Sequence, residues 1–218
     1  MRQGRILLLA LMLGTGVVNA ADFSLGGLVG YKGGASVRLI GTVSNFAEEF
    51  PLAMEFGAGL TWLNPGIPAD ARRIFINDAT DGTPEKSGSQ WDLRLDFLYR
   101  LKVMGRSRLY AYAGVRRSMF TGNFKFVGGN EDFDIRCNQW GLGAGVKGLF
   151  AMGKNVDFTV GVGFDEYFAN TLQGHDTSYS PDGETVNGHH QYTYDDADAA
   201  INQPKFQPTA MIGISYTF

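Results

Sequence analysis

The sequence has only one cysteine, Cys137, among 218 residues. An intramolecular disulfide is therefore excluded, and a single thiol with no activating cluster beside it is predicted to be structural or incidental. The sequence also lacks a large excess of either sign of charge. It has 19 Lys and Arg and 22 Asp and Glu, which give a net charge of −3. This balance gives no basis for nucleic-acid binding.

Long hydrophobic runs are missing as well. The apolar run at residues 6–13 is short of the roughly 20 residues that a membrane-spanning helix needs. Arg2 and Arg5 precede it and small residues ending at Ala20 follow it, which is typical of a secretory signal peptide. We expect residues 1–20 to be cleaved and residues 21–218 to form one domain. Any membrane crossing in that domain would use β-strands.

Strict alternation of apolar and charged residues is the strongest pattern in the chain. In residues 91–101, every second side chain from Trp91 to Leu101 is apolar, and the residues between them include Asp92, Arg94, Asp96 and Arg100. Such alternation sends the two sets to opposite faces of a strand. A slip of one residue would place these charges in lipid, where an arginine near the midplane costs roughly 2 to 4 kcal/mol.

The alternation recurs often enough to predict eight strands: residues 23–31, 35–43, 52–62, 91–101, 109–120, 140–150, 156–168 and 206–218. The connections 44–51, 102–107 and 151–155 are short, and the connections 64–88, 121–134 and 169–205 are long; the remaining outer connection, 32–34, is unexpectedly short. Short and long connections therefore mostly alternate. The predicted fold class is all-β, an eight-stranded antiparallel up-and-down transmembrane β-barrel with short periplasmic turns and longer extracellular loops.

A soluble β-sandwich or a lipocalin-like carrier is the main alternative fold, because a strand with one wet face alternates in the same way. Strands in such proteins are usually about 5 or 6 residues long, whereas a tilted bilayer crossing needs about 9 to 11. The length of the predicted strands and the asymmetry of the connections favour the membrane barrel.

The last predicted strand ends in Tyr216-Thr217-Phe218, with Tyr216 and Phe218 on its apolar face. An alternating final strand with a terminal aromatic residue resembles the insertion signal of bacterial outer-membrane barrels, and residues 21–218 resemble the small OmpA/OmpX-type barrels. The resemblance implies a location in the bacterial outer membrane, contact with its lipids, and handling by the barrel-assembly machinery.

The residues predicted to face inward include ten charged side chains. They are Arg38, Glu55, Asp92, Arg94, Asp96, Arg100, Arg116, Lys147, Asp157 and Asp165. Five are positive and five are negative, so this set is formally neutral. Because the interior of an eight-stranded barrel is just wide enough for side chains, we predict a packed ion-pair network rather than an open channel. A narrow polar pore or proton pathway is the alternative.

The long connection 169–205 contains groups that bear on chemistry. Its histidines and carboxylates match no metal-binding spacing, and they are interpreted as solvated polarity: His175, Asp176, His189, His190, Asp195, Asp196 and Asp198. A hydrolase could use Ser178 or Ser180 with His175, but no nucleophile motif surrounds them. No catalytic residue, metal ligand or cofactor is predicted.

Aromatic residues fall into two groups. Those near predicted strand ends are expected to anchor the barrel at the membrane interfaces: Tyr31, Trp62, Trp91, Tyr99, Trp140, Tyr167 and Tyr216. Three others, Tyr179, Tyr192 and Tyr194, lie in the last outer loop. They are interpreted first as solvated loop residues and alternatively as contacts for an extracellular partner.

The sequence therefore predicts an integral outer-membrane barrel that is not an enzyme. Its expected role is structural, or is an interaction made through the surface loops. Passive transport of small solutes is the runner-up, and an envelope enzyme acting on lipid or peptide is the third class considered.

Overall fold

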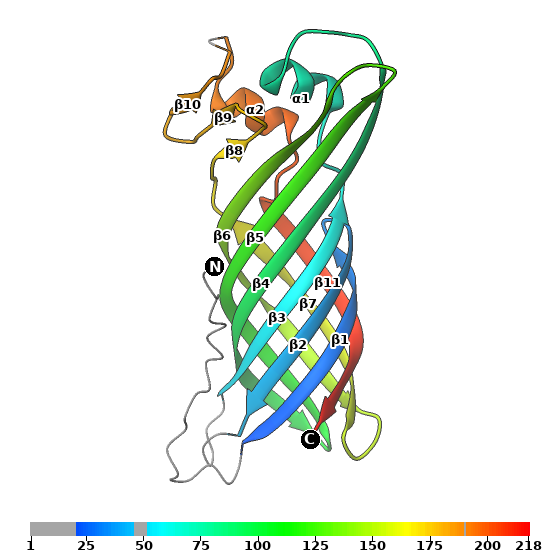
Figure 1. Cartoon of the computed structure of the whole chain (residues 1–218). Helices are drawn as coiled ribbons and strands as arrows, with labels where there is room; N and C mark the ends of the chain where they lie inside the picture. The colour runs from blue at the N-terminus through cyan, green and yellow to red at the C-terminus, as the bar shows by residue number, and fades with distance from the viewer. Residues whose placement is uncertain (1–20, 46–51, 190) are drawn as a thin grey trace, which may run out of the picture.

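A computed structural model describes residues 21–45, 52–189 and 191–218; the predicted signal peptide lies outside these residues. Eight long strands form the barrel: β1 (Asp22–Lys32), β2 (Ala35–Ser44), β3 (Leu52–Leu63), β4 (Thr83–Met104), β5 (Ser107–Val127), β6 (Asp132–Ala151), β7 (Val156–Tyr167) and β11 (Phe206–Thr217). Each pairs antiparallel with its neighbours, and β11 closes the sheet between β7 and β1 (Figure 1). The predicted eight-stranded barrel is confirmed.

The remaining elements lie at the end of the barrel opposite the C-terminus (Figure 1). They are the helices α1 (Pro68–Phe75) and α2 (Tyr194–Ala200), and the two-residue strands β8 (Leu172–Gln173), β9 (Ser178–Tyr179) and β10 (Thr185–Val186). Within the described residues, no helix is long and apolar enough to cross a membrane.

The two faces of the wall have opposite chemistry. On β4, Trp91, Leu93 and Phe97 point outward and are each more than half exposed, whereas Asp92, Arg94 and Asp96 are buried in the interior. The same outward row runs over the other strands, with Leu25, Leu39, Phe56, Trp140, Val162 and Ile214 among its members. The barrel is therefore apolar outside and largely polar inside, the reverse of a soluble protein.

The turn between β1 and β2 is short because two glycines form it. Gly33 has a φ of +67°, which glycine adopts without steric cost. A Cβ on Gly34 would lie 1.9 Å from the carbonyl oxygen of Trp62 on β3. The backbone approach at this end of the barrel therefore requires glycine at both positions.

Three strands are longer than predicted. β4 begins at Thr83, and β5 and β6 run to a connection of only four residues, 128–131. The predicted loop 121–134 is therefore wrong for most of its length, and the predicted loop 64–88 is wrong at its end. The alternation continues beyond the barrel, but its apolar members, such as Phe124 and Phe133, are buried against the two helices. The apolar and polar faces thus exchange sides above the barrel.

Candidate functional site

The centre of the lumen holds six charged side chains that form one alternating chain of ion pairs. The Lys32 ammonium lies 2.7 Å from Asp92 and 3.6 Å from Asp165. Arg116 bridges Asp165 at 2.6 Å and Asp96 at 2.8 Å, and Arg94 pairs with Asp96 at 2.6 Å. Three cations thus meet three carboxylates, and all six side chains are almost fully buried.

Inward-facing glycines make room for this network. A Cβ on Gly143 would lie 2.1 Å from a carboxylate oxygen of Asp165 and 2.4 Å from the Arg116 guanidinium. A Cβ on Gly59 would lie 2.8 Å from Asp92. The lumen accommodates these large charged groups because Gly143 and Gly59, the residues paired with Asp165 and Asp92 on the neighbouring strands, carry no side chain.

The half of the lumen nearer the C-terminus contains two further pairs. Lys147 binds Glu55, which also accepts a hydrogen bond of 2.9 Å from the Thr42 hydroxyl. Arg108, which is partly exposed, pairs with Asp157. Charges in this part of the barrel are therefore also neutralised in pairs.

The structure departs from the predicted set of lumen residues at four positions. Arg100 lies partly exposed four residues before the end of β4, and its guanidinium donates to the Asn45 side chain. Lys32, predicted to lie in the outer connection, is instead a buried member of the network. Tyr167, predicted to anchor the barrel in lipid, is 4% exposed and accepts a hydrogen bond from Lys32. Arg38 is buried, but no carboxylate of the described residues lies within ion-pair distance of it.

Two of these departures, at Lys32 and Tyr167, lie at the upper ends of strands. Lys32 is the last residue of β1 and lies one residue beyond the predicted strand 23–31, whereas Tyr167 is the last residue of β7 and lies inside the predicted strand 156–168. Continuing the alternation of β1 by one residue from Tyr31 places Lys32 inside. The parity of the strand was therefore a usable signal for Lys32, whereas a general preference of aromatics for interfaces misplaced Tyr167.

Side chains cross the lumen towards both of its ends. Towards the helices, the Gln207 amide donates to Gln90 at 3.0 Å, and the Gln139 amide donates to the carbonyl oxygen of Pro204 at 2.9 Å. Towards the C-terminus, a cavity of about 20 Å³ lies between Ala53, Tyr110 and Lys147. That volume accommodates about one water molecule.

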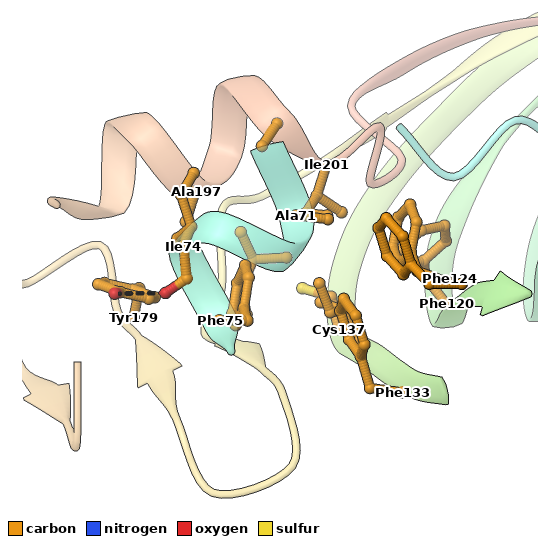
Figure 2. Close-up of a cluster of buried hydrophobic side chains, with 14 residues drawn as sticks. Ala71, Ile74, Phe75, Phe120, Phe124, Phe133, Cys137, Tyr179, Ala197 and Ile201 are labelled. Atoms are coloured by element: carbon orange, nitrogen blue, oxygen red, sulfur yellow. Dashed lines mark hydrogen bonds between the residues drawn. The ribbon is translucent and has the colours of Figure 1, made fainter. Parts of the chain in front are cut away.

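The helices and the extended strand ends enclose a second hydrophobic core, which we call the cap core. It contains Ala71, Ile74 and Phe75 of α1, Phe120, Phe124 and Phe126 of β5, Phe133, Ile135 and Cys137 of β6, Leu172, Tyr179, and Ala197, Ala200 and Ile201 in and after α2. Figure 2 shows α1 seated between Tyr179 on one side and the phenylalanines on the other. The long outer connections thus fold into a packed layer over the barrel, which we call the cap.

Arg72 of α1 fastens the cap. Its guanidinium donates to the Asp81 carboxylate at 2.8 Å, to the Asp81 carbonyl oxygen at 2.7 Å and to Glu131 at 2.6 Å, and it lies 4.5 Å from the centre of the Phe126 ring. Hydrogen bonding by Arg72 holds the pKa of Asp81 below its ordinary value. Hydrogen bonds from Asn77 and Arg72 lower the pKa of Glu131. One side chain thus joins α1 to the beginning of β4 and to the β5–β6 connection.

The loop tyrosines belong to the cap core rather than to a free surface. Tyr179 is fully buried and its hydroxyl donates to the carbonyl oxygen of Ile74 at 3.0 Å. Tyr192 and Tyr194 are partly buried against the same core. The interpretation of Tyr179 as a solvated or partner-binding residue is therefore wrong, because its ring is used to pack α1.

The polar residues of the last outer loop are spread over separate contacts. His175 and Asp176 are both exposed, with 3.9 Å between the imidazole Nδ1 and a carboxylate oxygen. Ser180 is hydrogen bonded to Thr171, and Asp196 caps α2 together with Thr193. In the part of the chain that the structure describes, no group of three metal-ligating side chains is assembled. Among the residues that the structure describes, no serine hydroxyl is hydrogen bonded to a histidine side chain.

The two residues of the predicted insertion signal lie on the outside of the barrel. Tyr216 is 45% exposed and Phe218 is 73% exposed, and their ring centres are 5.1 Å apart. The backbone N–H of Phe218 donates to the carbonyl oxygen of Phe23, which ties the end of β11 to the beginning of β1. Their role in insertion stays a prediction.

Comparison with known proteins identifies the fold. No protein-family model and no curated protein matches the sequence. The solved structure of a major outer membrane protein from Thermus thermophilus superimposes with a TM-score of 0.75 at 23% identity, covering 91% of this chain and 100% of that one. Neisserial surface protein A and the N-terminal β-barrel domain of Pseudomonas aeruginosa OprF give TM-scores of 0.44 and 0.42 at 12% and 13% identity. They cover 91% and 92% of this chain, and 96% and 98% of their own.

Proposed function

We propose that the chain is an integral protein of the bacterial outer membrane. The observation that carries this proposal is the continuous apolar exterior of the barrel, on which Leu39 is 72% exposed and Trp140 is 58% exposed. A soluble monomer rarely exposes an apolar patch of more than a few hundred Å². Hydrocarbon is the medium that would cover such a surface around all eight strands.

The height of the apolar exterior fits a bilayer. From Leu52 to Trp62 on β3, and from Trp91 to Leu101 on β4, the outward row spans ten residue steps. At about 3.3 Å per step and a tilt of roughly 40°, ten steps rise about 25 Å, the height of the apolar band of outer-membrane barrels. Tryptophans stand at the upper end of both rows, where amphipathic rings favour the interface.

The role proposed within the membrane is structural or interactive rather than transport or catalysis. Side chains cross the lumen, and most of its charges are held in ion pairs that a passing solute would have to separate. The cap covers the end predicted to face the exterior of the cell and is the part that would meet envelope components or an extracellular partner. Insertion by the barrel-assembly machinery belongs to the same proposal.

Planar-bilayer recording tests the closed lumen. Purified protein refolded in detergent and inserted into a lipid bilayer is expected to give no reproducible solute-sized conductance. As a positive control, the variant Arg116→Ala removes the central bridge between Asp96 and Asp165 and is expected to raise the frequency of brief openings. A stable conductance of the unaltered protein would replace the structural role by passive transport.

Protease treatment of intact cells tests the proposed orientation. The short connection 128–131 joins β5 and β6 beyond the barrel. Protease added outside the cells is expected to cleave within the cap region and to leave the barrel in the outer-membrane fraction. Protection of the cap in intact cells, with cleavage only after the outer membrane is opened, would contradict the orientation.

A further inference from the structure

The central lumen contains one positive charge more than its carboxylates can neutralise. Three cations, Lys32, Arg94 and Arg116, form ion pairs with the three carboxylates Asp92, Asp96 and Asp165. Arg38 points into the same interior, so four cations meet three carboxylates. Elsewhere in the lumen, Glu55 forms an ion pair with Lys147, and Asp157 forms one with the partly exposed Arg108.

Arg38 is the cation that has no direct ion-pair partner among the described residues. It is 6% exposed, and its Nε and Nη2 atoms make no hydrogen bond with the described residues. Its neighbours across the sheet are Leu28 on β1 and Gly59 on β3, neither of which brings an acceptor side chain. Rotation of Arg38 towards Asp92 would change which cation lacks a carboxylate, but it would not change the count.

An arginine does not escape this imbalance by losing its proton, because the guanidinium stays charged in proteins. A buried charge without a counter-charge is strongly disfavoured. We propose that the lumen binds one monovalent anion of halide size against the Arg38 guanidinium. One anion together with the three carboxylates balances the four cations, and a spherical anion accepts hydrogen bonds from the free Nε and Nη2 without a fixed geometry.

Diffraction with bromide tests the site directly. The protein is refolded with sodium bromide as the only halide salt, so that slow exchange through the closed barrel does not limit occupancy. An anomalous scattering peak is expected within hydrogen-bond distance of the Arg38 guanidinium, and it is expected to disappear in Arg38→Met. No peak in the unaltered protein would overturn the proposal. A peak of equal height in both proteins would indicate an adventitious ion only and would also overturn it.

Thermal unfolding supplies a second readout. Protein refolded in sodium chloride is compared with protein refolded in sodium gluconate at equal ionic strength, and the unfolding midpoint is followed on gels. A ligand that binds only the folded state raises the midpoint as its concentration rises. Chloride is expected to raise the midpoint of the unaltered protein but not that of Arg38→Met. The matched control, Arg117→Met, removes a partly exposed outward arginine that lies over the Trp140 ring and is expected to keep the chloride response.

A second variant keeps the test decisive if Arg38→Met does not fold. Leu28→Glu places a carboxylate on the residue paired with Arg38 and so supplies the missing negative charge from the chain. This variant is expected to fold without a chloride response and without the bromide peak. A chloride response in Leu28→Glu equal to that of the unaltered protein would overturn the Arg38 site.

Discussion

Packing of the side chains in the lumen depends on individual inward-facing glycines and individual charged residues. A side chain at Gly143 would occupy the space in which Arg116 meets Asp165. The sequence predicts nine of the ten buried lumen charges from strand parity alone, and it misses Lys32 because that residue lies at a predicted strand end. Which charges pair with one another could not be predicted, because partners such as Arg116 and Asp165 are 49 positions apart.

The space beside Gly143 leads to a prediction for its replacement by alanine. Gly143→Ala is expected to lower the free energy of unfolding by about 1 to 3 kcal/mol, the usual cost of overpacking a filled interior. The measurement is a urea titration followed by the mobility shift between folded and unfolded bands. The matched control is Gly161→Ala, also inward-facing, where a Cβ would meet only the Val146 carbonyl oxygen at 3.9 Å. Equal effects of the two changes would contradict the packing argument.

Removing one carboxylate of the network is predicted to cost more. Asp165→Asn leaves Arg116 and Lys32 with one buried counter-charge fewer. Breaking a buried ion pair in this way typically destabilises a protein by about 3 to 5 kcal/mol. The same urea titration measures the loss. Glu166→Gln is the control, because its side chain is exposed on the other face of β7. A change of under about 1 kcal/mol for Asp165→Asn would show that the network contributes little.

At the scale of elements, the strands inside the apolar band were predictable and the cap was not. Period-two alternation in β3, β4 and β11 identifies both the strand and its face, since one face meets water-free surroundings. The helices α1 and α2 are only eight and seven residues long, too short to give a clear helical period. Their packing against the extended ends of β5 and β6 depends on contacts between distant segments, which local patterns do not encode.

The contacts of Arg72 lead to a prediction for the cap alone. Arg72→Ala is expected to loosen α1 and the β5–β6 connection while the barrel keeps its fold. The side-chain methyl signals of Ile74 and Ile201 in the cap core are expected to broaden or shift in nuclear magnetic resonance spectra, while those of Ile212 and Ile214 on β11 stay unchanged. Arg73→Ala is the control, because Arg73 pairs with Asp70 at the surface. Unchanged Ile74 and Ile201 signals in Arg72→Ala would contradict the fastening role.

The same contacts make the cap sensitive to acid. The pKa values of Asp81 and Glu131 are lowered in the folded cap, so their stabilising effect is complete above the ordinary carboxyl pKa of about 4. It is lost as the pH falls through the lowered values. The cap methyl signals are therefore expected to change in strongly acidic solution, where the unaltered protein and Arg72→Ala converge. A difference between the two proteins that persists at the lowest pH would contradict this linkage.

The location and role proposed for the whole protein depend on which medium surrounds the barrel. On β3, β4 and β6, apolar side chains face outward. Charged side chains lie behind them in the interior, where they form ion pairs. The fold is that of a solved outer-membrane protein. The proposed location, closed lumen and exposed cap all follow from this arrangement if lipid covers the wall.

Nitroxide scanning along β4 tests this dependence most directly. In a Cys137→Ala background refolded into lipid bilayers, single spin labels are placed at Leu93, Leu95 and Phe97, and at the exposed cap residue Lys125 as an aqueous control. The three wall labels are expected to collide readily with oxygen dissolved in the bilayer and rarely with a water-soluble nickel complex, while the Lys125 label shows the reverse. Wall labels as accessible to the nickel complex as Lys125 would contradict the membrane-spanning barrel.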